Sequence, residues 1–160
     1  MSQLSHLSPS TWPNEKNNID ANCMNIGVWD SDGDLEFIDR NDSGDSSFIK
    51  NFQSEEGNKI AVRRLDSLPE INEFSMIKLL KVEAEGGEPE VLMGATGILP
   101  KVEFVSVDCG FERGVAQKST ADEVIKVMLE NEFECIGCNP VRLALAFQRR
   151  SRSSSTVPVQ

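Results

Sequence analysis

Histidine is nearly absent from this chain of 160 residues, and its one copy, His6, stands in a Ser- and Pro-containing N-terminal stretch without periodicity. An internal Ser-His-Asp triad, a Cys-His pair and a histidine-rich metal site are therefore excluded. Acid–base chemistry in this chain must come from carboxylates, lysines or cysteines.

Basic charge is also scarce. The chain has 16 Lys and Arg against 26 Asp and Glu, which gives a net charge of -10. Nucleic-acid-binding domains usually carry a basic footprint, so we expect no nucleic-acid partner and no anionic membrane partner. No stretch approaches the roughly 18 apolar residues of a membrane span, and the N-terminus lacks the basic and apolar regions of a signal peptide. We expect a soluble, cytoplasmic protein.

The chain lacks a second cysteine pair to match Cys135 and Cys138. A zinc ribbon needs two CxxC pairs, and Cys23 and Cys109 stand alone. The single pair falls between expected strands, whereas a thioredoxin-type redox site has its pair at a helix start. We therefore expect four reduced, mostly buried thiols and no metal centre.

What the chain does have is the patterning of one folded domain. Its length and its hydrophobic content of 39% suit a single domain with a core. We expect a flexible leader over residues 1–13, a folded part over 14–150 and a disordered, low-complexity tail over 151–160.

Apolar residues in the folded part follow strand and helix periods. The alternation on both sides of the tight-turn pair Asp32-Gly33 predicts a hairpin over 24–39, followed by a surface loop over 39–57. The further expected elements are strands over 59–68 and 76–82, a helix over 89–98, a strand over 102–107, a helix over 120–131 that starts with a Thr120/Glu123 capping box, and strands over 133–138 and 141–148.

The stretch over 76–82 is apolar on both faces apart from two lysines, which is typical of a parallel strand covered on both sides. The order of elements predicts an α/β fold with a mostly parallel sheet and an antiparallel strand pair at the C-terminal end. In such sheets ligands bind outside the carboxyl ends of the strands, so we expect the functional residues to lie there.

The richest strand end carries four glutamates. Glu88 and Glu90 begin the expected helix, and we interpret them as residues that complement the helix dipole. Glu83 and Glu85 follow the strand directly, and we interpret them as functional. Clustered carboxylates at this place suit three tasks: accepting a hydroxyl proton, binding an amine or hydroxyl, or holding a divalent cation. Their mutual repulsion predicts that one or more of the pKa values is raised.

Four blocks of the chain stand in the order NIGVWDSDGDLEF, RRLDSL, LLKVEAEGGEPEVLMGATGIL and VEFVSVDCGFERG. Together they resemble the FkbM family of S-adenosylmethionine-dependent methyltransferases. LLKVEAEGGEPEVLMGATGIL resembles the family signature Lys-Ile-Asp-Val-Glu-Gly-Ala-Glu followed by a Leu-x-Gly-Ala helix. NIGVWDSDGDLEF, RRLDSL and VEFVSVDCGFERG resemble its strand and hairpin, its Thr-Leu-Asp-Ser-Leu segment, and its next core strand with the following loop. The resemblance covers residues 14–148, and Glu83 stands where the family usually has Asp.

The resemblance implies a Rossmann-like class I methyltransferase sheet. It also implies transfer of a methyl group from S-adenosylmethionine to a hydroxyl oxygen of a small-molecule or glycan acceptor, usually a sugar or natural product. In that framework Glu83 and Glu85 are the catalytic candidates near the transferred methyl group, and Asp30 lies on the cofactor side. On the acceptor side the resemblance places Lys81, Asp108, Glu112 and Arg113.

The family's cofactor loop, a Gly-rich turn after the first strand, has no counterpart here, because no GxGxxG or GxG sequence occurs. We expect an N-terminally truncated methyltransferase domain with weak cofactor binding, in which the strand over 76–82 has an open edge. Three explanations stay open: an incomplete sequence, a degenerate pseudo-enzyme, or a partner that supplies the missing half. The alternative function is a non-catalytic acidic α/β module that binds a partner or a small ligand.

Overall fold

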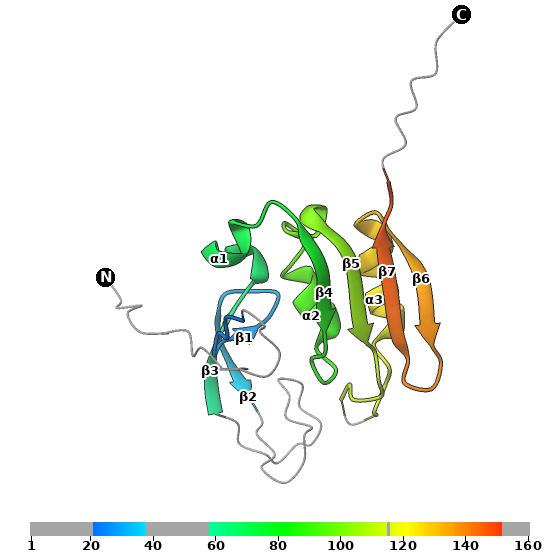
Figure 1. The fold of residues 1–160 in the computed structure, drawn as a ribbon. Helices are drawn as coiled ribbons and strands as arrows, with labels where there is room; N and C mark the ends of the chain where they lie inside the picture. The colour runs from blue at the N-terminus through cyan, green and yellow to red at the C-terminus, as the bar shows by residue number, and fades with distance from the viewer. Residues whose placement is uncertain (1–20, 38–57, 115, 152–160) are drawn as a thin grey trace, which may run out of the picture.

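A computed structural model describes residues 21–37, 58–114 and 116–151. The expected leader, the expected loop over 39–57 and the tail beyond residue 151 lie outside the described residues. The described part contains a three-stranded and a four-stranded sheet, with helices packed on the larger one (Figure 1).

The smaller sheet has the strand order β1-β3-β2. β3 lies between the other two strands, parallel to β1 and antiparallel to β2. The bounds are Gly27–Val28 for β1, Gly33–Phe37 for β2 and Asn58–Arg63 for β3.

The hairpin predicted over 24–39 is therefore wrong, because β1 and β2 do not pair with each other. The carboxylate of Asp32 accepts a hydrogen bond of 2.8 Å from the backbone N–H of Arg64 and one of 2.9 Å from the hydroxyl of Ser67. The turn residue thus binds the chain beyond β3, and β3 takes the place between the two strands.

Two short helices follow β3, and the first of them replaces the end of the strand expected over 59–68. They are the 3-10 helix η1, Leu65–Ser67, and α1, Pro69–Asn72. The Asp66 carboxylate in η1 accepts hydrogen bonds from the backbone N–H groups of Gly97, at 3.0 Å, and Ile98, at 3.1 Å. The Asp66 side chain therefore connects the segment after β3 to residues 97 and 98, which follow the first helix packed on the larger sheet.

The larger sheet has the strand order β4-β5-β7-β6. β4 and β5 are parallel, and β7 is antiparallel to both of its neighbours, β5 and β6. Three strands thus run in one direction and β7 alone runs against them, and the antiparallel pair expected at the C-terminal end is confirmed. The bounds are Ile77–Val82 for β4, Val102–Asp108 for β5, Phe133–Asn139 for β6 and Ala144–Arg149 for β7.

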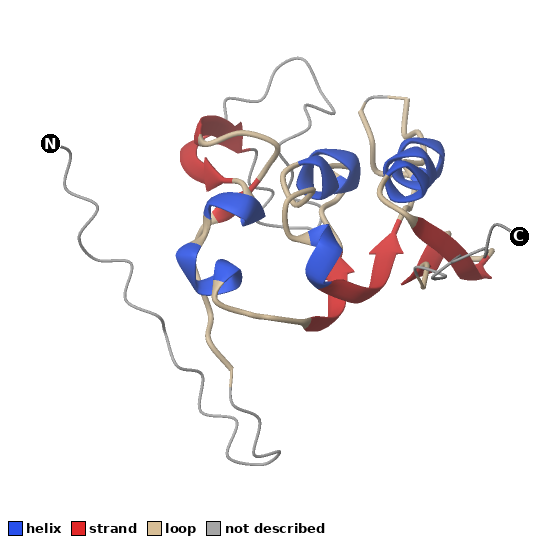
Figure 2. Cartoon of the chain, turned by 90° about the horizontal axis from the view of Figure 1, so that it is seen from above, coloured by secondary structure: helices blue, strands red, loops and turns tan. Residues whose placement is uncertain are grey.

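Helices α2, Glu88–Met93, and α3, Ala121–Glu130, lie on the same face of this sheet (Figures 1 and 2). The core forms between them and the strands, and its fully buried members include Leu92, Val105, Val107, Val124, Met128, Phe133 and Phe147. No described helix covers the opposite face, where the side chain of Leu79 is 57% exposed. The expectation that β4 is covered on both sides is therefore wrong.

Among the strands that the structure describes, β4 pairs only with β5, so its other edge is open, as expected. Helix α2 ends at Met93, with Gly94 as its C-cap, instead of running to residue 98, and the 3-10 helix η2, Leu99–Lys101, follows. A Cβ at Gly94 would overlap the carbonyl oxygen of Trp29. This close approach brings the chain after β1 against the end of α2. No helix in the described ranges combines the length and apolar character needed to cross a membrane.

Candidate functional site

The loop between β4 and α2 has an unusual backbone at the position where the sequence places its carboxylates. Glu85 has φ of 47° and Gly86 has φ of 93°. The left-handed region is rarely adopted by residues with a Cβ, so surrounding contacts must impose it at Glu85. At Gly86 a Cβ would stand 2.9 Å from the Cα of Arg113, so this position requires glycine.

Glu88 lies beneath this loop and is only 1% exposed. Its carboxylate accepts hydrogen bonds from the backbone N–H groups of Ala84, at 2.9 Å, and Gly86, at 3.1 Å, and from the hydroxyl of Thr120, at 2.9 Å. The capping box predicted for Thr120 and Glu123 is therefore wrong, because the Thr120 hydroxyl serves Glu88 and makes no cap bond. The Ser119 hydroxyl accepts from the N–H of Ala121 instead.

Arg113 holds the outer side of the same loop. It forms a two-pronged ion pair with Glu90, at 2.6 and 2.9 Å, and donates to the carbonyl oxygen of Gly86 at 2.6 Å. The hydrogen bond with Glu90 also raises the pKa of Arg113 above its usual value. Glu88 and Glu90 thus do more than complement the helix dipole, because together they anchor the loop that carries Glu85.

Glu83 lies between two cations at the end of β4. Lys81 donates a hydrogen bond to its carboxylate, and the guanidinium of Arg142 lies 4.0 Å from it. These contacts, with the Lys81 hydrogen bond as the largest cause, hold the pKa of Glu83 below its usual value. Glu83 is thus not one of the carboxyl groups whose pKa is raised, because the Lys81 hydrogen bond and the charges of Lys81 and Arg142 outweigh desolvation.

A polar cavity of about 420 Å³ opens at the ends of β4 and β5. Five carboxylates line it, from Glu83, Glu85, Glu88, Asp108 and Glu112, together with the guanidinium of Arg142. The lining of this acidic cavity also includes two exposed apolar residues, Phe111, 61% exposed, and Val141, 90% exposed. The structure thus brings together four of the residues singled out from the sequence.

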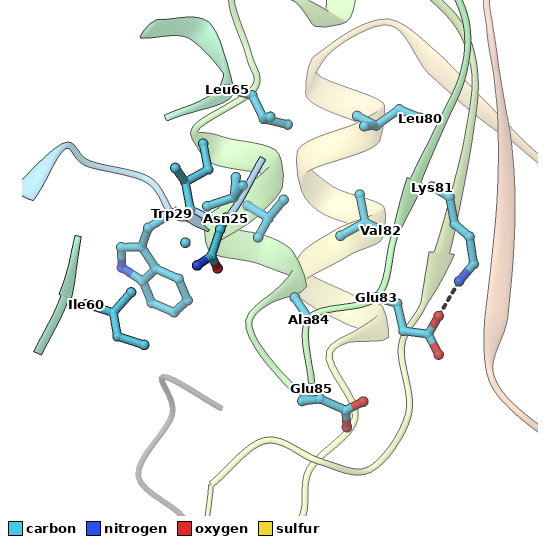
Figure 3. Close-up of a pocket in the computed structure, with 14 residues that line it drawn as sticks. Asn25, Trp29, Ile60, Leu65, Leu80, Lys81, Val82, Glu83, Ala84 and Glu85 are labelled. Carbon is cyan, nitrogen blue, oxygen red and sulfur yellow. Dashed lines mark hydrogen bonds and ion pairs between the residues drawn. The ribbon is translucent and has the colours of Figure 1, made fainter. Parts of the chain in front are cut away.

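A second, more apolar cavity of about 540 Å³ lies between the two sheets, beside the open edge of β4 (Figure 3). Trp29 and Asn25 form one wall and Leu80 and Val82 the other. The segment over 83–85 closes its end, and the carboxylates of Glu83 and Glu85 point away from Trp29. Because Glu83 and Glu85 line both cavities, this segment is their common wall.

The other residues singled out from the sequence fall in different places. Lys81 lines the apolar cavity and pairs with Glu83. Arg113 is committed to Glu90 and to the loop carbonyl, and it lines neither cavity. Asp30 is exposed, accepts a hydrogen bond from the hydroxyl of Ser31 at 2.9 Å, and also lies outside both linings.

Two lining residues, Trp29 and Arg142, were not found from the sequence. Arg142 comes from the turn between β6 and β7, where the Asn139 side chain accepts hydrogen bonds from the N–H groups of Val141 and Arg142. Its guanidinium reaches Asp108 at 2.9 Å. The local sequence around Asn139 and Arg142 does not predict that the Arg142 guanidinium reaches Asp108. The position of Trp29 near the end of an expected strand could have marked it as a candidate for a binding site.

The cysteines differ from expectation. Cys109 alone is buried, and burial raises the pKa of its thiol to about 12, while Cys23, Cys135 and Cys138 are exposed. The prediction of mostly buried thiols is therefore wrong. In the part of the chain that the structure covers, no three Cys, His, Asp or Glu side chains gather as a set of metal ligands.

The described residues thus form an α/β domain with two cavities that share the carboxylate-bearing segment at the end of β4. The family profile described as Methyltransferase FkbM domain matches residues 13–135, so the chain belongs to this methyltransferase family. No curated protein and no solved structure matches the chain.

Proposed function

We propose that this protein is a methyltransferase that uses S-adenosylmethionine and methylates a hydroxyl oxygen of a small-molecule or glycan acceptor, within a Rossmann-like domain. One observation carries the proposal. The segment over 83–85 is the common wall of an apolar cavity and an acidic cavity. Group transfer between two bound molecules needs adjoining compartments that hold the reacting atoms close together.

The apolar cavity fits the cofactor in size and in chemistry. Its volume of about 540 Å³ lies within the usual range of small-molecule sites. An indole ring and aliphatic walls suit a purine ring, and Trp29, Leu80 and Val82 supply them. The neighbouring carboxylates of Glu83 and Glu85 suit the positive sulfonium, which supplies the methyl group when the cofactor is bound. Asp30 remains our candidate for a contact with the cofactor's polar groups.

The acidic cavity suits a neutral, hydroxyl-bearing acceptor. Ionised carboxylates only accept hydrogen bonds, so Glu85, Asp108 and Glu112 would each take one from an acceptor hydroxyl. Glu83 stays ionised because Lys81 and Arg142 lower its pKa, which favours it as a hydrogen-bond acceptor that orients the hydroxyl. We assign the departing hydroxyl proton to Glu85, because the lowered pKa of Glu83 makes Glu83 the weaker base, and we assign Lys81 and Arg113 to holding these groups in place.

A second candidate is a non-catalytic module that binds a partner. The observation that favours it is the open edge of β4, since an unpaired strand edge can accept a strand from another chain. In this case the acidic cavity would bind a ligand without chemistry on it.

Calorimetric titration of the folded protein with S-adenosylmethionine distinguishes the two candidates. We expect saturable binding, and we expect Trp29→Ala to weaken it while Met93→Ala, an exposed helix position outside both cavities, leaves it unchanged. Transfer of a labelled methyl group to a set of sugars would then confirm the activity. No binding at millimolar cofactor by a protein with cooperative unfolding would rule out catalysis by this chain alone.

A further inference from the structure

Glu88 is a buried carboxylate that the proposed chemistry leaves unused. Although it contributes to the lining of the acidic cavity, its side chain is 1% exposed. A buried charge is costly unless hydrogen bonds compensate it, so its three donors indicate what it does. Two of them are backbone N–H groups of the β4–α2 loop, and the third is the Thr120 hydroxyl at the start of α3.

The two loop donors flank Glu85. One oxygen of Glu88 accepts from Ala84 and from Gly86 at the same time, so it bridges the residues on either side of the left-handed Glu85. Residues with a Cβ seldom adopt this conformation unless their surroundings enforce it. The two hydrogen bonds to Glu88 therefore account for the direction in which the Glu85 side chain points.

Gly86 is held from the outside as well. Arg113 donates a hydrogen bond to the carbonyl oxygen of Gly86 at 2.6 Å, and the N–H of Gly86 donates to the carboxylate of Glu88. Thr120 fixes the second oxygen of Glu88 at 2.9 Å, which connects the loop to α3. The loop is thus held on its outer side by Arg113 and on its inner side by Glu88. The connection to α3 runs through the Glu88 side chain alone.

We infer that Glu88 is the positioning residue of this site. Its carboxylate sets the conformation of the segment over 83–87, and this segment forms the wall that the two cavities share. Glu88 acts through the reach of its hydrogen bonds, not through its charge on a ligand. The inference deepens the proposed function and rests on it for the catalytic meaning of that wall.

Two substitutions of Glu88 separate the effect of its side-chain length from the effect of its negative charge. Glu88→Gln loses the charge but keeps an oxygen for both loop N–H groups and an amide that can donate to Thr120. Glu88→Asp keeps the charge but is one methylene too short to bridge both donors. We expect Gln to bind S-adenosylmethionine within about twofold of wild type, and Asp to bind it roughly tenfold or more weakly.

Hydrogen exchange of the Ala84 and Gly86 amides gives a readout that needs no ligand. We expect both amides to exchange faster in Glu88→Asp, relative to the amides of the β5 core, and to stay protected in Glu88→Gln. Thr120→Val is the matched stability control, because it removes a partner of Glu88 and leaves the two loop bonds in place. Its cofactor affinity should stay near wild type even if its melting temperature falls.

Three results would overturn the inference. Weak binding in Glu88→Gln with protected loop amides would show that the charge is what matters. Equal behaviour of Glu88→Asp and Thr120→Val would reduce Glu88 to a general stabilising role. Unchanged exchange of both loop amides in Glu88→Asp would remove the positioning role itself. If Glu88→Asp does not fold, Glu88→Met, which has similar length and no acceptor oxygen, replaces it.

Failure of the proposed function looks different. If wild-type protein does not bind S-adenosylmethionine, the proposed function is lost, and the exchange of the two loop amides alone still decides whether Glu88 positions the segment.

Discussion

Arg142 donates a hydrogen bond of 2.9 Å to Asp108, although 34 residues separate the two in the chain. The same guanidinium lies 4.0 Å from Glu83, so one cation from the β6–β7 turn joins the carboxylates at the ends of β4 and β5. This cation offsets part of the repulsion between the carboxylates of the acidic cavity. Two of the cavity's five carboxylates thus share one cation, whose side chain is 68% exposed.

The first prediction concerns the pKa of Glu83. Lys81→Met should raise it, and Arg142→Gln should raise it less, because the Lys81 hydrogen bond is the largest cause of the shift and Arg142 the smallest. The side-chain carboxyl carbon of Glu83, followed by NMR as the pH is changed, measures both effects. A pKa that stays the same or falls in Lys81→Met would contradict the assignment.

The same shift has a consequence for stability. The folded-state pKa of Glu83 lies below its ordinary value of 4.5, so its contribution to stability is present above that pH. It is lost as the pH falls through the folded-state pKa. In Lys81→Met this part of the acid dependence should shrink in thermal melts below pH 4.5, because only Arg142 still lowers the pKa of Glu83, whereas Lys126→Met on the exposed side of α3 should leave it unchanged.

The second prediction concerns Gly94. A Cβ there would overlap the carbonyl oxygen of Trp29, and both partners of this contact are backbone. Gly94→Ala should therefore lower the free energy of unfolding by about 1–3 kcal/mol, the usual cost of overpacking. Gly137→Ala is the control, because its Cβ would stand 3.7 Å from Ala146, an ordinary contact. Chemical denaturation of both variants measures the difference, and equal stability would argue against the packing of Trp29 on α2.

The third prediction concerns Asp66. Asp66→Ala removes the acceptor of two backbone N–H groups, those of Gly97 and the buried Ile98. The Gly97 N–H is exposed to water, and the Ile98 N–H also donates to the carbonyl oxygen of Ala95 at 2.9 Å, so neither donor is left buried without an acceptor. The free energy of unfolding should therefore fall by about 0.5–1.5 kcal/mol, the usual net contribution of a hydrogen bond. Asp34→Ala, at an exposed position on β2, should change it by less than about 0.5 kcal/mol. A similar effect of both changes would mean that Asp66 does not tie the smaller sheet to the end of α2.

The fourth prediction concerns the thiols. In native protein three cysteines should react quickly with a thiol reagent, and Cys109 should react only on unfolding, because it is buried and its pKa is raised to about 12. Counting labelled thiols by mass spectrometry before and after denaturation measures this. Cys109→Ala should lower the count after denaturation by one and leave the native count unchanged. Rapid labelling of a fourth thiol in native wild type would contradict the buried position of Cys109.

Local patterning was enough to predict most strands and helices of the larger sheet. The apolar runs over 102–107 and 133–138 and the helical period over 120–131 each need only neighbouring residues, and the structure has an element at each place. The carboxylates at the end of β4 could also be placed, because a strand followed by a helix exposes its carboxyl end.

The sequence by itself thus determined the kind of fold, the family, and the position of Glu83 and Glu85 along the chain. Only the tertiary structure decided which polar groups pair. Asp32 binds beyond β3 instead of closing a hairpin, Thr120 serves Glu88 instead of capping α3, and Arg142 reaches into the acidic cavity. Secondary structure follows local periodicity, whereas a buried or bridging polar group takes whichever partner the folded chain brings within 3 Å, and no local pattern records that choice.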